Sequence, residues 1–190
     1  MLNIGNYKLR KLQISDKENL VKYGNNYEIW LNLTDNFPHP YTNSDAEWFI
    51  EYCNNQTNEF NLCIDFEGEF IGMMGVIFNT GIRKKTVEFG YWLAQPFWGK
   101  GITTQCSKKF IEYIFANYDI IRIQSSVFEW NKASMKVLEK VGFKLEGILK
   151  NAILKNEKIA DEFKYAILKE DFTILKKSSI LVSCQTLNGA

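Results

Sequence analysis

The chain has 190 residues, of which 46% are hydrophobic and 15% aromatic, and its formal net charge is +1. This length fits one domain with a sizeable core, and the composition excludes a disordered chain. No segment is apolar for long enough to be a signal peptide or a membrane span, and no basic run indicates nucleic-acid binding. We expect one domain over residues 1–175, a tail of unknown role over 176–190, and a cytoplasmic location.

The four cysteines form neither a CxxC pair nor a zinc-like spacing; they are Cys53, Cys63, Cys106 and Cys184. Scattered thiols in a chain without an export signal are expected to stay reduced and mostly to fill the core. We therefore expect no metal site.

Hydrophobic periodicity predicts strands and helices in the first half of the chain. The elements expected there are a strand over 7–14, a polar helix capped by Ser15 or Asp16, a break at the prolines of 37–42, a helix opened by Thr42 or Ser44 and running to 53, and strands over 59–66 and 69–78. Glu67-Gly68, between those two strands, is a favourable hairpin turn.

The second half of the chain predicts a strand–helix–strand unit followed by a helix and a hairpin. The elements expected are a strand over 84–93, a helix from 102 to about 117, a strand over 120–128, a helix that Gly142 ends, and a hairpin of 143–154 with 160–169. In the strand over 84–93, Val87, Phe89, Tyr91 and Leu93 share one face, and Glu88, Gly90 and Trp92 share the other. One mixed sheet flanked by helices follows from this order.

Charge is unevenly distributed along the chain. Between Tyr23 and Ile82 there is no Lys or Arg, whereas the same stretch carries nine acidic residues. A solvated acidic surface explains this pattern, and so does a molecule with one region suited to a cation and another suited to an anion.

Two glycines, Gly99 and Gly101, stand between the strand over 84–93 and the helix that begins at 102. Glycine permits unusual backbone angles, and a helix start presents unpaired N–H groups and the positive end of its dipole. The pattern is typical of a tight turn, and it also suits a pyrophosphate site built from main-chain groups of residues 98–103, with Lys100 adding charge. It matches neither the nucleotide P-loop nor the dinucleotide fingerprint.

These pieces together resemble the GNAT superfamily of acetyl-CoA-dependent N-acetyltransferases, and most of all the branch of ribosomal-protein N-terminal acetyltransferases. The matching segments are "FPHPYTNSDAEWFIE", "FIGMMGV", "VEFGYWLAQPFWGKGITTQ" and "NKASMKVLEKVGFKLEGILKNA". The resemblance implies an α/β GNAT fold, with a mixed, mostly antiparallel central sheet whose middle strands splay apart around the cofactor's pantetheine arm.

The resemblance also implies which residues bind acetyl-CoA. Main-chain groups of Trp92, Leu93 and Ala94 are expected to hold the pantetheine arm, and Asn131 to contact the cofactor near its thiol. The pyrophosphate is expected at Gly99, Gly101, Ile102 and Thr103. The glycine pattern itself adds the main chain of Trp98 and the charge of Lys100 to this site. The chain departs from the common family pattern at Pro96, Thr103, Gln105 and Cys106, none of which removes an N–H group from that site.

Acetyl transfer to an amine needs a base and profits from an acid. Glu88 is the candidate base, because it projects on the face that Gly90 and Trp92 share; an exposed strand glutamate is also often merely solvated. The usual acid of many GNAT enzymes, a tyrosine, is replaced by Leu138. The branch suggests Ser134 instead. An equally good alternative is that the Ser134 hydroxyl has only a structural role, in the first turn of a helix that Asn131 caps.

The resemblance implies that the loop around His39 and the next helix border the acceptor site. The candidates are Trp30, His39, Tyr41 and Trp48, with a plain loop residue as the alternative for His39 and packing anchors as the alternative for Tyr41 and Trp48. We expect a metal-free N-acetyltransferase, a monomer or homodimer, that acts on a protein N-terminus. The alternatives are a polyamine or aminoglycoside acceptor, and a non-catalytic acyl-CoA-binding module.

Overall fold

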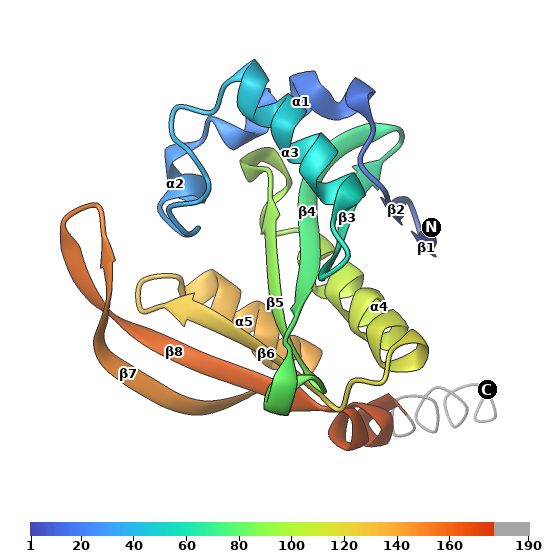
Figure 1. Ribbon diagram of the computed structural model, residues 1–190, viewed down its shortest axis with the longest axis vertical. Helices are drawn as coiled ribbons and strands as arrows, with labels where there is room; N and C mark the ends of the chain where they lie inside the picture. The colour runs from blue at the N-terminus through green and yellow to red at the C-terminus, as the bar shows by residue number, and fades with distance from the viewer. Residues whose placement is uncertain (177–190) are drawn as a thin grey trace, which may run out of the picture.

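The computed structural model describes residues 1–176, which build an eight-stranded sheet with helices on both faces (Figure 1). Its strands are β1 Leu2–Ile4, β2 Tyr7–Arg10, β3 Glu59–Phe66, β4 Glu69–Phe78, β5 Thr86–Leu93, β6 Arg122–Phe128, β7 Lys144–Lys155 and β8 Lys158–Leu168. Its helices are α1 Lys17–Gly24, α2 Tyr27–Trp30, α3 Asn43–Asn55, α4 Ile102–Asn117 and α5 Lys132–Val141, and residues 169–176 are also helical. All but the first residue of the expected tail lie outside the described residues.

The strand order is β1-β2-β3-β4-β5-β6-β8-β7. Neighbouring strands are antiparallel throughout this described sheet except for β5 and β6, which are parallel. Parallel neighbours need a crossover connection, and α4 provides it. The expectation of a mixed, mostly antiparallel sheet is confirmed.

Local sequence signals define several element ends. Thr42 caps α3: its hydroxyl accepts from the Asp45 N–H at 3.2 Å, and the Asp45 carboxylate accepts from the Thr42 N–H at 2.7 Å. Gly142 ends α5 in the left-handed region, with φ of 114°. The turn between β3 and β4 is Glu67-Gly68, as predicted.

The alternation of β5 separates two cores. Val87, Phe89 and Leu93 pack with α4 and α5 on one face of the sheet. Trp92 packs on the other face with apolar residues of α1, α2 and α3. Each face of β5 is therefore buried under a different group of helices, which fixes the register of the strand.

The sheet opens between its two parallel strands. β5 and β6 pair only over Thr86↔Arg122, Val87↔Ile123 and Glu88↔Gln124, although both strands continue beyond that point. β6 stays paired with β8 along its full length, and β5 stays paired with β4 to Leu93. The divergence exposes main-chain groups of β5 along a gap in the middle of the sheet, as the splayed strands of the GNAT resemblance predict.

Four differences from the sequence predictions concern short elements. The first strand stops at Arg10 instead of residue 14, because the Asp16 carboxylate accepts from the Gln13 N–H at 2.9 Å and turns the chain. The small strand β1 and the single-turn helix α2 were not predicted, and neither was the helix over 169–176.

Candidate active site

The loop between β5 and α4 has the backbone geometry of an anion site. Gly99 and Gly101 both have φ of 74°, the left-handed region that favours glycine, and Gly101 is the N-cap of the 16-residue helix α4. The next three N–H groups, those of Ile102, Thr103 and Thr104, are the first of the helix and have no acceptor within it. A Cβ at Gly99 would meet no atom within 4 Å, so the loop leaves open space beside these groups.

The residues beside the glycines take different positions. Ile102 is 1% exposed, so its side chain belongs to the core and only its main chain is available to a ligand. The Trp98 indole N–H donates to the Leu93 carbonyl at 2.6 Å, which ties the loop back to the end of β5. Lys100 does not line the central cavity, and its ammonium lies 5.4 Å from the centre of the Phe97 ring.

The register of β5 decides which main-chain groups face the gap. The Ala94 N–H donates to the Ile71 carbonyl at 2.8 Å, and antiparallel pairing alternates, so Trp92 also turns its main-chain groups toward β4. Tyr91 and Leu93 turn theirs toward the gap. This register favours Tyr91 and Leu93, rather than Trp92 and Ala94, as main-chain partners of an arm that lies there.

Glu88 lies where β5 and β6 separate. Its carboxylate accepts from the Gln124 side-chain N–H. Gln124 in turn accepts from the Arg122 guanidinium at 3.1 Å, and hydrogen bonds to Glu146 are the main cause that raises the pKa of Arg122. The carboxylate of Glu88 is therefore held at the base of the gap. Gly90, two residues on, leaves space beside it, since a Cβ there would meet nothing within 4 Å.

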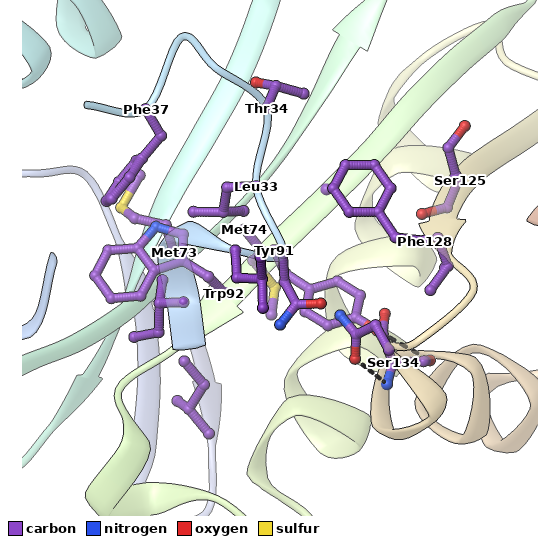
Figure 2. A pocket seen from close by; sticks show the side chains of 18 of the residues that line it. Leu33, Thr34, Phe37, Met73, Met74, Tyr91, Trp92, Ser125, Phe128 and Ser134 are labelled. Atoms are coloured by element: carbon purple, nitrogen blue, oxygen red, sulfur yellow. Dashed lines mark hydrogen bonds between the residues drawn. The ribbon is translucent and has the colours of Figure 1, made fainter. Parts of the chain in front are cut away.

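Ser134 lines the cavity from the first turn of α5. The Asn131 side-chain oxygen accepts from the Ser134 N–H at 3.0 Å, which is the helix cap that the sequence offered as an alternative role. The Ser134 hydroxyl lies 2.8 Å from the Tyr91 hydroxyl, and both residues line the cavity (Figure 2). Burial raises the pKa of Tyr91 to about 12. Leu138 is fully buried in the core beneath α5.

Tyr91 was not predicted as a site residue, because its place in the alternation of β5 assigned it to the core. One signal was available in the sequence. A buried tyrosine needs a hydrogen-bond partner for its hydroxyl, and the segment "NKASMKVLEKVGF" offers Ser134 near the start of a predicted helix.

The acceptor candidates separate into two pairs. Tyr41 and Trp48 line the cavity, whereas Trp30 and His39 do not. Tyr41 is 3% exposed and stacks on Phe37 with centroids 4.8 Å apart, so its packing role is clear, while Trp48 is 61% exposed at the cavity margin. His39 stacks on Trp30 at 5.4 Å.

The tip of the β7–β8 hairpin closes over α2 and the loop that follows it. The Lys155 ammonium donates to the Asp35 carboxylate at 2.7 Å and lies 4.1 Å from the centre of the Trp30 ring. Asn156 donates to the Tyr27 hydroxyl at 3.0 Å. Lys155 is only 2% exposed, although its partner Asp35 is 81% exposed. We call these contacts the hairpin latch; they join segments about 120 positions apart.

One continuous cavity of about 1660 Å³ connects the glycine loop, the gap in the sheet and the hairpin latch. It exceeds the roughly 300–1,000 Å³ of an ordinary small-molecule site, so it has room for two ligands in line. Figure 2 shows its walls: Met73 and Trp92 on the β4–β5 side, Ser125 and Phe128 on β6. The acidic residues that line it are Glu28, Asp35, Asp45, Glu59, Glu88 and Glu162, and the lysines are Lys132, Lys136, Lys140, Lys155 and Lys158.

A comparison with known protein families identifies the family of this chain. Residues 7–144 match the family model described as an acetyltransferase (GNAT) domain. The chain belongs to the GNAT family. It is an acetyl-CoA-dependent N-acetyltransferase.

Named relatives agree with the family. The "Uncharacterized N-acetyltransferase p20" of Bacillus licheniformis is 29% identical, over 86% of this chain and 93% of that protein. The "Putative ribosomal N-acetyltransferase YdaF" of Bacillus subtilis (strain 168) is 30% identical, over 66% of this chain and 67% of YdaF. The crystal structure of the microcin C7 self-immunity acetyltransferase MccE, in complex with acetyl-CoA and AMP, is 26% identical with a TM-score of 0.76, over 86% of this chain and 93% of that one.

The GNAT cavity brings together most of the residues chosen from the sequence. Those that line it are Glu88, Trp92, Leu93, Trp98, Gly99, Gly101, Ile102, Thr103, Asn131, Ser134, Tyr41 and Trp48. Those that do not are Ala94, Lys100, Trp30 and His39. Within residues 1–176, no three metal-ligating side chains gather into a possible metal site. None of the described helices is both long and apolar enough to cross a membrane.

Proposed function

We propose that this GNAT enzyme acetylates the α-amino group of a protein N-terminus, with Glu88 as the base and Ser134 as the donor to the departing thiol. The observation that carries the proposal is the continuity of the cavity. It runs from the amide-lined start of α4, between Glu88 and Ser134, to an acidic end beneath the hairpin latch.

Acetyl-CoA binds in the half of the cavity next to α4. Its pyrophosphate is held by main-chain groups of Gly99 and Gly101 and by the N–H groups at the start of α4, where the helix dipole favours negative charge. The pantetheine arm lies in the gap and pairs with the main-chain groups of Tyr91, which face it. Asn131 uses its oxygen in the helix cap, so its amide nitrogen remains to donate toward the thioester end.

The reaction begins when the acceptor amine loses its proton through water to Glu88. The nitrogen lone pair attacks the thioester carbon, and the Leu93 N–H, which faces the gap, donates to the oxygen that gains charge. As the C–S bond breaks, its electron pair moves to sulfur, and the Ser134 hydroxyl donates to that sulfur. A base of this kind typically contributes about 10²–10⁴-fold.

The acidic end of the cavity suits an amine that arrives protonated. Of the cavity carboxylates, Glu28 and Asp45 belong to α2 and α3, and Asp35 to the loop after α2, where it already pairs with Lys155 of the latch. A peptide α-amino group has a pKa of about 8, whereas a lysine amine has a pKa of about 10.4. An N-terminus therefore needs less help from Glu88 to lose its proton. The similarity to YdaF points in the same direction.

A free amino acid or another small amine is the second candidate acceptor. The hairpin latch favours it, because Lys155 and Asp35 close the cavity over the acceptor end. L-amino acid N-acetyltransferase AaaT of Escherichia coli (strain K12) is 26% identical over 85% of this chain and 97% of that protein.

A thiol-release assay with matched acceptors tests the proposal. We expect turnover with a peptide that has a free N-terminus, no change when its internal lysine is replaced by arginine, and complete loss when its N-terminus is blocked. Mass spectrometry of the product should place the acetyl group on the α-nitrogen. A kcat/KM at least tenfold higher for spermidine or a free amino acid than for any peptide would overturn the N-terminal assignment.

A further inference from the structure

The hydroxyl groups of Tyr91 and Ser134 form a pair in the wall of the cavity, 2.8 Å apart. Tyr91 comes from β5 and Ser134 from the first turn of α5, so the pair bridges the two sides of the gap at the level where the sheet opens. Figure 2 shows the two side chains meeting there. Neither the acceptor nor the pyrophosphate contacts derived above use the tyrosine hydroxyl.

A serine hydroxyl carries one hydrogen, and its neighbours decide where that hydrogen points. The Ser134 carbonyl, at 3.3 Å from the Tyr91 hydroxyl, is the weaker acceptor for the tyrosine, because it also lies in the hydrogen-bonding ladder of α5. The Ser134 Oγ, at 2.8 Å, is the better one. When Tyr91 donates to that oxygen, the hydrogen of Ser134 turns away from the tyrosine and is available to another acceptor, and Ser134 lines the cavity.

We infer that Tyr91 is a positioning residue for acetyl transfer: it donates to Ser134 and so aims the Ser134 hydrogen at the sulfur of the departing thiol. The inference rests on the proposed role of Ser134. Burial raises the pKa of Tyr91 to about 12, which keeps the phenol protonated, and therefore a donor, throughout the neutral range. Burial of a phenol with one well-placed acceptor also costs little mobility in each catalytic cycle.

The step balances without a proton leaving Tyr91. The bond from the amine nitrogen to the acetyl carbon forms, the C–S bond breaks, and the electron pair goes to sulfur. A thiol of this kind has a pKa of about 8.5, so the sulfur departs as a thiolate that the Ser134 hydroxyl stabilises by hydrogen bonding. The proton that the amine gave up through Glu88 returns to the thiolate through solvent.

A purely structural role for Tyr91 makes a different prediction. The ring lies 5.3 Å from that of Phe89, and its hydroxyl could simply satisfy Ser134. In that case removal of the hydroxyl lowers stability and leaves the chemical step unchanged. Tyr165 provides a matched control, because its hydroxyl donates to Glu139 at 3.1 Å and it does not line the cavity.

The test measures kcat, the KM for acetyl-CoA and the melting temperature of Tyr91→Phe, Ser134→Ala, the double variant and Tyr165→Phe. We expect kcat to fall about tenfold in each single cavity variant and no further in the double variant, because the two hydroxyls act as one unit. The KM for acetyl-CoA should stay within twofold. Tyr165→Phe should lose similar stability and keep its kcat.

Two outcomes would overturn the inference: a Tyr91→Phe enzyme with kcat within twofold of the unmodified chain, or losses that multiply in the double variant. Should Tyr91→Phe not fold, 3-fluorotyrosine at position 91 keeps ring and hydroxyl while lowering the phenol pKa. The alkaline limb of kcat should then move to lower pH, and an unchanged profile would count against the inference. Any amine that the unmodified enzyme acetylates serves here, so failure of the N-terminal acceptor proposal is seen separately.

Discussion

At the scale of single residues, three features of its surroundings fix the position of the Glu88 carboxylate. It is the last residue of β5 that pairs with β6, it accepts from Gln124, and it borders the space that Gly90 leaves open. Each of these features keeps a carboxylate pointed at the base of the gap. We therefore treat Glu88 as the base that acts on the incoming amine.

Glu88→Gln should lower kcat about 100-fold, because the amide cannot take a proton, while it can still accept from Gln124. The dissociation constant for CoA should stay within twofold, since Glu88 makes no contact with the start of α4. Steady-state kinetics and a calorimetric CoA titration check both parts. Unchanged turnover across the neutral pH range would remove Glu88 from the mechanism.

At the scale of elements, the proposal assigns cosubstrate binding to the start of α4. Its cap is a glycine with φ of 74°, so no side chain competes with a ligand for the first N–H groups of the helix. An L-residue pays roughly 1–2 kcal/mol in the left-handed region, and the loop would relax away from this conformation to relieve that strain.

Gly101→Ala should therefore raise the KM for acetyl-CoA about tenfold and lower the melting temperature. Gly81→Ala is the matched control: Gly81 has φ of 59° with no atom within 4 Å of a built Cβ, and it does not line the cavity. It should lose comparable stability and keep the KM. Equal KM values in the two variants would mean that the α4 loop does not hold the cosubstrate.

At the scale of the whole molecule, the hairpin latch joins the C-terminal half of the chain to the N-terminal half across the acceptor end. Lys155 is buried against Trp30, while its ion-pair partner Asp35 remains in solvent. An ion pair with one exposed partner contributes at most about 1 kcal/mol to the stability of the fold. We therefore expect the pair to matter for the shape of the cavity rather than for stability. The latch defines the far wall of the cavity.

Lys155→Met should raise the KM for the acceptor severalfold, because the hairpin tip is released from Asp35, and leave the KM for acetyl-CoA unchanged. Lys17→Met is the control: it removes an ion pair with Glu47, at 2.9 Å, and neither residue lines the cavity. Acceptor and cosubstrate saturation curves measure both effects. An acceptor KM that stays the same in both variants would show that the latch has no part in acceptor binding.

The sequence predicted the long elements well because their signals are local. The i, i+4 stripe of apolar residues in α4, the turn at Glu67-Gly68 and the Thr42 cap each act within a few positions. The single-turn helix α2 also has a local cap, because the Asn26 side-chain oxygen accepts from the Ile29 N–H at 3.1 Å. A four-residue helix depends on distant contacts as well, and the Asn26 amide donates to Gln95, 69 positions away.

The part of the candidate site that main-chain groups form could be predicted from the sequence. Contacts between side chains of distant segments were less predictable. Gly99 and Gly101 indicated the loop, because glycine readily adopts the positive φ that both positions have. The pairing of Tyr91 with Ser134, and the burial of Lys155 against Trp30, arise only when distant segments come together. The extent of the domain at residue 175 stays a prediction.

A crystal structure with bound CoA tests the central claim most directly. We predict the pyrophosphate against the N–H groups of Ile102, Thr103 and Thr104, and the thiol in the gap of the sheet, within hydrogen-bond reach of Ser134. A CoA molecule bound outside the gap between β5 and β6, with the start of α4 empty, would contradict the account.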